Sequence, residues 1–174
     1  LRAKSFNKYL ASNLIEIGKE KFNFEIFSDF NLLPHYNTDD HNQDNWPKTL
    51  LELEEKIKKA DGVIFVTPEY NFSVPGYLKN CIDWISRLPN QPLDRKPVCI
   101  QSASLGPLGG ARVQYHLRQI LVFLNAKVMN KNEIFVTFAK QKFDESSGKL
   151  TDDITIDFIR KQLDAFYDFI YILS

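Results

Sequence analysis

The chain is poor in the residues that mark disulfide-rich proteins and metal-binding proteins. It has only two cysteines, Cys81 and Cys99, in 174 residues, with neither a CxxC pair nor a zinc-type spacing. This excludes a disulfide framework and favours small reduced core residues. The three histidines, His35, His41 and His116, do not cluster with other ligand types, so we assign no metal.

An excess of one charge and long apolar runs are also missing. Lys plus Arg number 22 and Asp plus Glu number 22, which leaves no net field to attract nucleic acid or an acidic membrane. No apolar run approaches the roughly 20 residues that a membrane-spanning helix needs. With 44% hydrophobic and 25% charged residues, the composition is typical of a soluble globular protein. We expect one cytoplasmic domain over residues 1–174.

Helix-like and strand-like patterns alternate along the chain. Apolar residues recur at helical spacing in five segments, and short apolar or alternating runs lie between them. The predicted helices are Ser5–Lys21, Lys48–Ala60, Pro75–Leu88, Gly109–Leu124 and Thr151–Leu173, and the predicted strands are Phe22–Phe27, Gly62–Thr67, Pro97–Ala103 and Glu133–Phe138. We expect Phe30–Pro47 to be a long polar loop.

This alternation predicts a parallel sheet with helices on both faces, wound in both directions from its centre. The chain opens with Leu1-Arg2-Ala3-Lys4-Ser5, a loop that leads into a helix. An α/β unit of this kind normally begins with a strand that feeds such a loop. We therefore expect about ten residues of a first strand to precede Leu1 in the parent protein, as the fifth strand of the sheet.

The first polar segment with possible chemistry opens the first predicted helix. Arg2, Ser5 and Asn7 lie where a helix start offers unpaired N–H groups and about half a positive charge, which together suit a phosphate. The alternative is that Ser5 only caps the helix, a contribution of ~1 kcal/mol. The residues alone leave both interpretations open.

Two further polar loops follow predicted strands. Thr67–Gly76 carries two prolines and one glycine, which fix its shape and leave backbone groups free to face a ligand. Ser102–Gly110 carries three glycines but neither a GxGxxG nor a Walker A pattern, and a planar ligand could approach its backbone. Each loop could instead be an ordered turn. Flavin mononucleotide (FMN), which is planar and carries a phosphate, is the natural candidate for three loops at one sheet edge.

Six segments carry a resemblance to a known family. They are Leu1-Arg2-x-x-Ser5-Phe6-Asn7, Leu33-Pro34-x-Tyr36-Asn37, Thr67–Gly76, Leu78-Lys79-Asn80 with Asp83-Trp84, Ser102-Ala103-Ser104-x-Gly106, and Gly109-Gly110-x-Arg112-x-Gln114. In these segments the chain resembles the NADPH-dependent FMN reductase family. The Thr67–Gly76 run is the most specific part, and beyond Leu124 only the order of elements is similar. The resemblance implies an α/β, flavodoxin-like, doubly wound five-stranded parallel sheet.

The resemblance also implies a role for each matched position. Arg2, Ser5 and Asn7 would hold the FMN phosphate. The isoalloxazine ring would be lined, mainly by backbone groups, by Pro68, Glu69, Tyr70 and Asn71, and approached from the other loop by Ser104, Gly106 and Gly109. Glu69 could be a proton donor, although a structural carboxylate is the favoured interpretation, and no catalytic side chain is assigned.

The expected activity is an NAD(P)H-dependent FMN oxidoreductase. NADPH or NADH would pass hydride to bound FMN, which would then reduce a small acceptor such as a quinone or an azo compound. We expect a homodimer or homotetramer with apolar contacts from Phe72, Tyr77 and Trp84, and no nucleic-acid or membrane partner. The alternatives are an FMN-binding electron carrier, against which the zero net charge argues, and a flavin-free regulatory binding protein.

Overall fold

Short strands and longer amphipathic helices alternate along the chain, as the sequence predicts. The computed structural model describes residues 4–42 and 46–174. Its strands are β1 (Val63–Val66), β2 (Pro97–Ala103), β3 (Lys127–Val128) and β4 (Ile134–Val136). Its helices are α1 (Phe6–Gly18), α2 (Thr38–Asn42), α3 (Lys48–Lys59), α4 (Gly76–Ile85), α5 (Ala111–Phe123) and α6 (Asp153–Leu173), with short 3-10 turns η1 (Phe30–Leu32) and η2 (Ala139–Gln141).

The sheet is parallel and centred on β2. β1 runs along one edge of β2, from the pair Val63 and Val98 to the pair Val66 and Gln101. β3 and β4 both pair with β2 as well. Because Gln101 pairs with Val66 in β1 and with Ile134 in β4, these two strands lie on opposite edges of β2. β3 and β4 therefore form two halves of one interrupted strand position.

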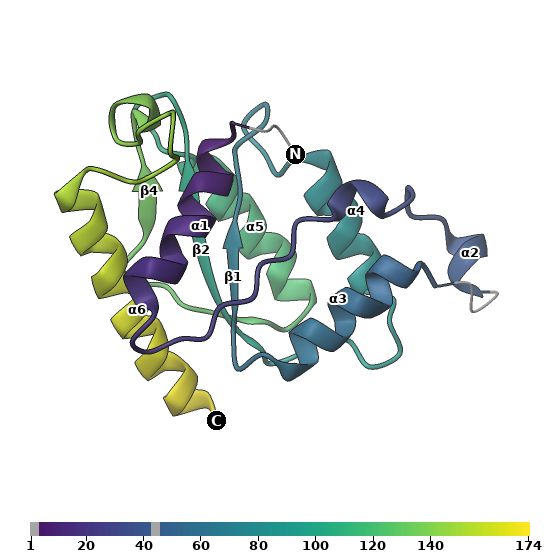
Figure 1. Ribbon diagram of the computed structural model, residues 1–174. Helices are drawn as coiled ribbons and strands as arrows, with labels where there is room; N and C mark the ends of the chain where they lie inside the picture. The colour runs from purple at the N-terminus through teal and green to yellow at the C-terminus, as the bar shows by residue number, and fades with distance from the viewer. Residues whose placement is uncertain (1–3, 43–45) are drawn as a thin grey trace.

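Helices cover both faces of this sheet (Figure 1). Ile64 and Val66 of β1 pack into the apolar cluster built with α1 and α6. Val63 and Phe65 pack into the cluster on the other face, built with α3, α4 and α5. Alternate residues of one strand thus reach opposite layers, as the pleat of a strand requires. The prediction of a doubly wound parallel α/β domain is confirmed.

Two predictions for the first half of the chain are wrong. Phe22–Phe27 forms no strand but an extended coil, although its residues alternate as in a strand. A strand needs a neighbouring backbone for its ladder, and among the described residues this segment has none. The segment 30–47 is not one loop, because it contains η1 and α2. The described residues hold four strands rather than five, and the strand expected before Leu1 lies outside them.

Trp84 belongs to the core and not to an exposed contact surface, which corrects its predicted place in a subunit interface. Its side chain is fully buried, and its indole N–H donates to the carbonyl of Pro34 at 2.9 Å. Asn80, one turn earlier on α4, donates to the same carbonyl at 2.8 Å. These two bonds fix the segment after η1 against α4.

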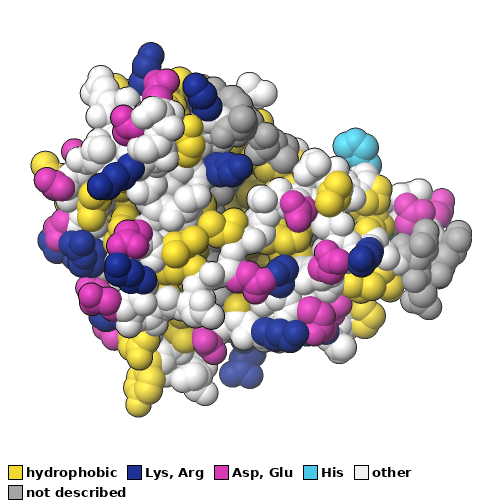
Figure 2. All heavy atoms as spheres, viewed as in Figure 1, with side chains coloured by type: hydrophobic (Ala, Val, Ile, Leu, Met, Phe, Trp, Pro, Cys, Tyr) yellow, Lys and Arg dark blue, Asp and Glu magenta, His cyan; other side chains and the backbone are white. Residues whose placement is uncertain are grey.

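The surface carries charges of both signs. Figure 2 shows basic and acidic side chains interspersed over the visible face, with no large patch of either sign. Within residues 4–42 and 46–174, no helix is both long and apolar enough to cross a membrane.

Candidate functional site at the carboxyl edge of the sheet

The start of α1 is attached to the end of β2 by the side chain of Asn7. Its amide Nδ2 donates to the carbonyl of Ala103 at 2.9 Å, and its Oδ1 accepts from the N–H of Ala103 at 2.9 Å. Asn7 is buried, and both ends of its amide are engaged in this pair. We had predicted Asn7 as a phosphate ligand, and the structure gives it a structural role at the same edge.

Ser5 is the N-cap of α1, which is one of the two interpretations that the sequence leaves open. Its backbone is extended, and its Oγ accepts from the N–H of Lys8 at 3.4 Å. The leading N–H groups of a helix have no partner within the helix, so the positive end of α1 is a place for an anion. Arg2, the third predicted phosphate ligand, lies outside the described residues.

The loop that follows β1 contains a tight reverse turn. Tyr70 and Ser73 exchange two backbone hydrogen bonds of 3.0 Å, and the residues between them, Asn71 and Phe72, have φ of 49° and 65°. Two consecutive positive φ values define a type I′ turn, in which glycine is the usual second residue. A phenylalanine held there is strained, and such strain is often found at functional sites.

Side chains of α5 hold this turn in place. The guanidinium of Arg112 lies over the ring of Phe72, with its central carbon 4.0 Å from the ring centroid. Nδ1 of His116 lies 3.1 Å from the hydroxyl of Ser73. Neither contact can be assigned from local sequence, because Arg112 and His116 lie on a helix about 40 residues away from the turn.

Glu69 caps α5 from the same loop. Its Oε2 accepts from the N–H groups of Arg112 at 3.0 Å and Val113 at 3.2 Å, and its Oε1 lies 3.6 Å from Nη1 of Arg112. A carboxylate at a helix N-terminus is stabilising because it pairs otherwise unpaired N–H groups and faces the positive end of the helix dipole. The structural interpretation of Glu69 is therefore supported.

The loop after β2 is fastened to the segment after β4. The N–H of Ser104 donates to Val136 at 3.0 Å, and Ser104 accepts in turn from the N–H of Ala139 at 2.9 Å. The carbonyl of Gly106 accepts from the N–H of Phe138 at 3.2 Å. Phe138 has φ of 48° and is 45% exposed, so a second strained aromatic residue stands at this edge. Sequence analysis missed it, since nothing local marks a phenylalanine for positive φ.

The described segments that carry predicted site residues, namely the start of α1 and the loops after β1 and β2, thus gather at the carboxyl edge of one sheet, at the top of Figure 1. Pro68, Glu69, Tyr70 and Asn71 belong to the loop after β1, and Ser104, Gly106 and Gly109 to the loop after β2. Ser5 and Asn7 open α1 beside them. The hydrogen bonds from Asn7 to Ala103 and from Glu69 to α5 tie these parts to one another.

Two glycines of this edge face open space. A Cβ added at Gly76 or at Gly106 would have no atom within 4 Å. Gly109 is different, because a Cβ there would lie 2.6 Å from the carbonyl carbon of Phe135. Close packing against Phe135 therefore explains the glycine at position 109. Open backbone at two loops and the positive end of α1 fit a planar group that carries a phosphate.

The side chains near this edge offer little acid, base or nucleophilic chemistry. Burial, together with the nearby Tyr70, raises the pKa of Tyr77 to about 12, so its hydroxyl stays neutral. Burial also raises the pKa of each thiol, Cys81 and Cys99, to about 12, so neither forms a reactive thiolate at neutral pH. Across the described part of the chain, no group of three or more metal-ligating side chains is found.

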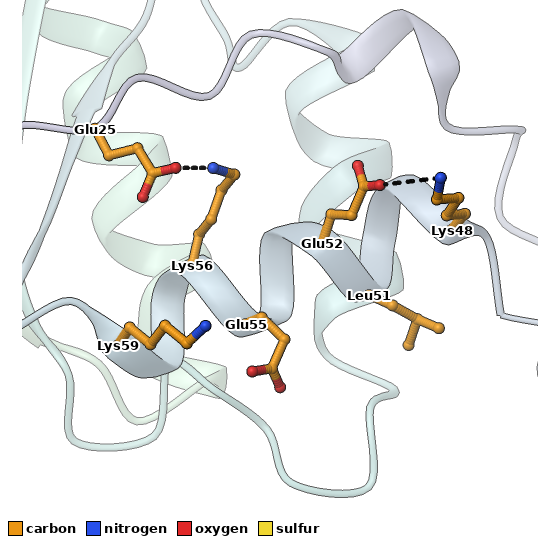
Figure 3. Close-up of a pocket in the computed structure, with 7 residues that line it drawn as sticks. All are labelled: Glu25, Lys48, Leu51, Glu52, Glu55, Lys56 and Lys59. Atoms are coloured by element: carbon orange, nitrogen blue, oxygen red, sulfur yellow. Dashed lines mark hydrogen bonds and ion pairs between the residues drawn. The ribbon is translucent and has the colours of Figure 1, made fainter.

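A shallow groove of about 600 Å³ lies elsewhere, along α3 (Figure 3). Its lining lysines and glutamates neutralise one another: Lys56 pairs with Glu25, and Nζ of Lys48 lies 3.6 Å from Glu52. Charged side chains that are already paired with one another offer a ligand few free partners. A second groove, of about 390 Å³, lies between α1 and α6 and is also lined by paired charges such as Lys21 and Asp164.

The fold is that of a flavodoxin-like α/β domain, with polar loops at the carboxyl edge of its sheet. The family profile of NADPH-dependent FMN reductases matches residues 1–141, and the chain belongs to this family. The resemblance read from the six segments is thus confirmed.

Individual relatives agree with this membership. A quinone reductase of Escherichia coli is 49% identical over 170 residues, which is 98% of this chain and 90% of the relative. An NAD(P)H-dependent FMN reductase of Pseudomonas aeruginosa is 41% identical over 165 residues, 95% of this chain and 88% of the relative. The solved structure of FerB, a flavoenzyme NAD(P)H:(acceptor) oxidoreductase of Paracoccus denitrificans, superposes with a TM-score of 0.88 at 32% identity, over 98% of this chain and 92% of its own.

Replacing Glu69 by Ala should destabilise the fold. The change leaves the N–H groups of Arg112 and Val113 without their carboxylate, and loss of such a cap costs about 0.5–2 kcal/mol. Urea unfolding measures the stability of Glu69→Ala and of Glu69→Gln. Because glutamine keeps one acceptor, the stability of Glu69→Gln should lie between those of the parent and Glu69→Ala. A Glu69→Ala protein as stable as the parent, with a shifted pH profile of turnover, would instead favour the proton donor.

Proposed function

We propose that this protein is an NAD(P)H-dependent oxidoreductase that reduces quinones and related small acceptors with two electrons, using FMN. The observation that carries the proposal is the convergence of the α1 start and the two strand-to-helix loops at one sheet edge, with open backbone at Gly76 and Gly106. Family membership and the activities of the relatives support the same reaction. The overall change converts NAD(P)H, a quinone and a proton into NAD(P)⁺ and a hydroquinone.

The chain's residues would bind and orient the reactants. The N–H groups at the start of α1 would hold the phosphate, with Ser5 beside them. The backbone at Gly76 and Gly106 would lie against the flat ring, because no side chain at those positions keeps it away. The chemistry that FMN supplies when bound is to accept a hydride and later to pass on two electrons.

The exposed apolar side chains of the loops would contact the acceptor. Tyr70, Phe72, Leu105 and Phe138 are 52%, 63%, 60% and 45% exposed at this edge. Apolar and aromatic surface beside a flat site suits the ring of a quinone and keeps water away from it. Glu69 is occupied in capping α5, and a pKa raised to about 12 makes Tyr77 a weak proton donor, so we assign the protons that the hydroquinone takes up to solvent.

The direct test follows the visible absorbance of the purified protein with FMN. Under anaerobic conditions, NADPH or NADH should bleach the band near ~450 nm, and a benzoquinone should restore it. Bleaching by dithionite alone, without response to either nucleotide, would indicate the electron carrier. A protein that takes up no FMN would indicate the flavin-free regulator. Either of these results would overturn the proposal.

Replacing Ser5 by Asp should weaken FMN while leaving the fold intact. Aspartate caps a helix as well as serine and faces the same dipole, so stability should not fall. Its charge would repel the phosphate, and we expect FMN affinity to drop about tenfold, ~1.4 kcal/mol. Riboflavin, which lacks the phosphate, should bind the variant and the parent alike.

Fluorescence titration with both flavins measures this difference. Ser5→Ala is the matched control, because it removes the cap without adding charge and should reduce stability by ~1 kcal/mol with a smaller effect on FMN. If Ser5→Asp and the parent bind FMN with equal affinity, the proposed placement of the phosphate at the start of α1 is wrong.

We further propose that the protein assembles as a homodimer or a larger homo-oligomer. With Trp84 in the core, the exposed residues of the site loops, above all Phe72 and Leu105, offer the apolar surface for such a contact. Light scattering at micromolar concentration should give at least twice the monomer mass, and Phe72→Glu should lower it. A monomer at every concentration would contradict the assembly.

The fifth strand of the sheet is also a proposal, on the outer edge of β1. All four residues of β1 are apolar yet only half-buried, whereas every residue of β2 is buried. In the described part of the chain, β1 has a ladder partner only on the β2 side. Amide exchange at 63–66 should be as slow as at 98–101, and fast exchange there would argue against a further strand.

A further inference from the structure

The central strand ends in two buried polar residues, which is unusual for the middle of a parallel sheet. Gln101 and Ser102 are both fully buried in β2. They point to opposite faces because neighbours in a strand alternate. Gln101 meets Gln162 of α6 on one face, and Ser102 meets Gln114 of α5 on the other.

Gln114 connects three separate backbone segments on the α5 face. Its Nε2 donates to the hydroxyl of Ser102 at 2.7 Å and to the carbonyl of Ile134 in β4 at 2.8 Å. The hydroxyl of Ser102 in turn donates to the carbonyl of Gly109 at 2.6 Å. A continuous relay therefore runs from α5 through the end of β2 to the loop that carries Ser104 and Gly106.

The same relay is enforced by close packing. A Cβ at Gly110 would lie 2.7 Å from Cβ and from Oγ of Ser102, and Gly109 and Gly110 both have positive φ. The loop therefore sits directly on Ser102 with no freedom to move toward it. Ser102 and Gln114 thus hold the Gly109–Gly110 end of this loop, while backbone bonds to the segment after β4 hold Ser104 and Gly106.

Gln114 is kept at a cost to stability. It is fully buried, and its Oε1 has no hydrogen-bond partner in the structure. A buried polar atom without a partner is destabilising, and an apolar side chain of the same size would avoid it. The amide of Gln114 is nevertheless engaged, because its Nε2 joins the hydroxyl of Ser102 and the carbonyl of Ile134.

We propose that Gln114 is a positioning residue for flavin binding. Through Ser102 it fixes the Gly109 end of the loop 104–110, and so the side of the loop against which the flavin ring would lie. It touches neither flavin nor acceptor. This inference rests on the proposed function, because it names the residue that shapes one wall of the same site.

The test replaces Gln114 by Met, which keeps volume and removes the amide. We expect about tenfold weaker binding of FMN and of riboflavin alike, since the ring and not the phosphate loses its wall. The absorption spectrum of the bound flavin should move toward that of free flavin. Both readouts are made by titration, without turnover.

Gln101→Met is the matched control. Gln101 is equally buried on the same strand, also donates through Nε2, at 2.7 Å to Gln162, and also has an unpartnered Oε1, but it faces α6. It should lose a similar amount of stability in urea while its FMN affinity stays within about twofold of the parent. Equal loss of affinity in both variants would mean general loosening and would overturn the inference.

Ser102→Ala provides a second route if Gln114→Met does not fold. This substitution breaks the relay at its middle with little change in volume. We expect a loss of FMN affinity of about tenfold, as for Gln114→Met, and the double variant that combines both substitutions should lose no more. If the parent binds FMN and either Gln114→Met or Ser102→Ala binds it with unchanged affinity, this inference alone is overturned. A parent that binds no flavin overturns the proposed function, and this inference with it.

Discussion

Backbone groups at the end of a buried parallel strand must find hydrogen-bond partners after the ladder stops, and the site depends on how this chain supplies them. Asn7 pairs with both backbone groups of Ala103, Glu69 pairs with the first N–H groups of α5, and Ser102 pairs with Gly109. Because buried N–H and C=O groups are costly when unpaired, these side chains are held in fixed positions. The loops that they hold become equally fixed.

This arrangement leaves a rigid edge with open backbone rather than a set of reactive side chains. The polar side chains that sequence reasoning assigned to a ligand are largely engaged in holding the loops. What they leave for a ligand is the start of α1, the backbone near Gly76 and Gly106, and the aromatic residues around them. Such a site suits a cofactor that brings its own chemistry and needs only to be bound and oriented.

Much of the fold, and the place of the candidate-site loops within it, could be predicted from the sequence. The strand Pro97–Ala103 has the predicted bounds, and Thr67–Gly76 joins a strand to a helix as its prolines and glycine indicate. The predicted strand Phe22–Phe27 failed because alternation reports a possible strand, whereas a strand also needs a neighbour. Local pattern carries no information about that neighbour.

The roles of individual site residues were harder to predict, for a physical reason. Asn7 at a helix start looks like an anion ligand, but its partner Ala103 lies 96 residues away along the chain. Phe72 and Phe138 adopt positive φ, which phenylalanine rarely does and which only the surrounding contacts impose. Residue type and spacing locate the loops, while tertiary hydrogen bonds decide which atoms remain available.

The most direct measurement is amide hydrogen exchange of the protein with and without FMN. The account predicts slower exchange on adding FMN at the start of α1 and in residues 67–76 and 104–110 together. The groove along α3, residues 48–59, should show no change. Protection confined to α3, or protection in one loop without the others, would contradict a single site formed by all three segments.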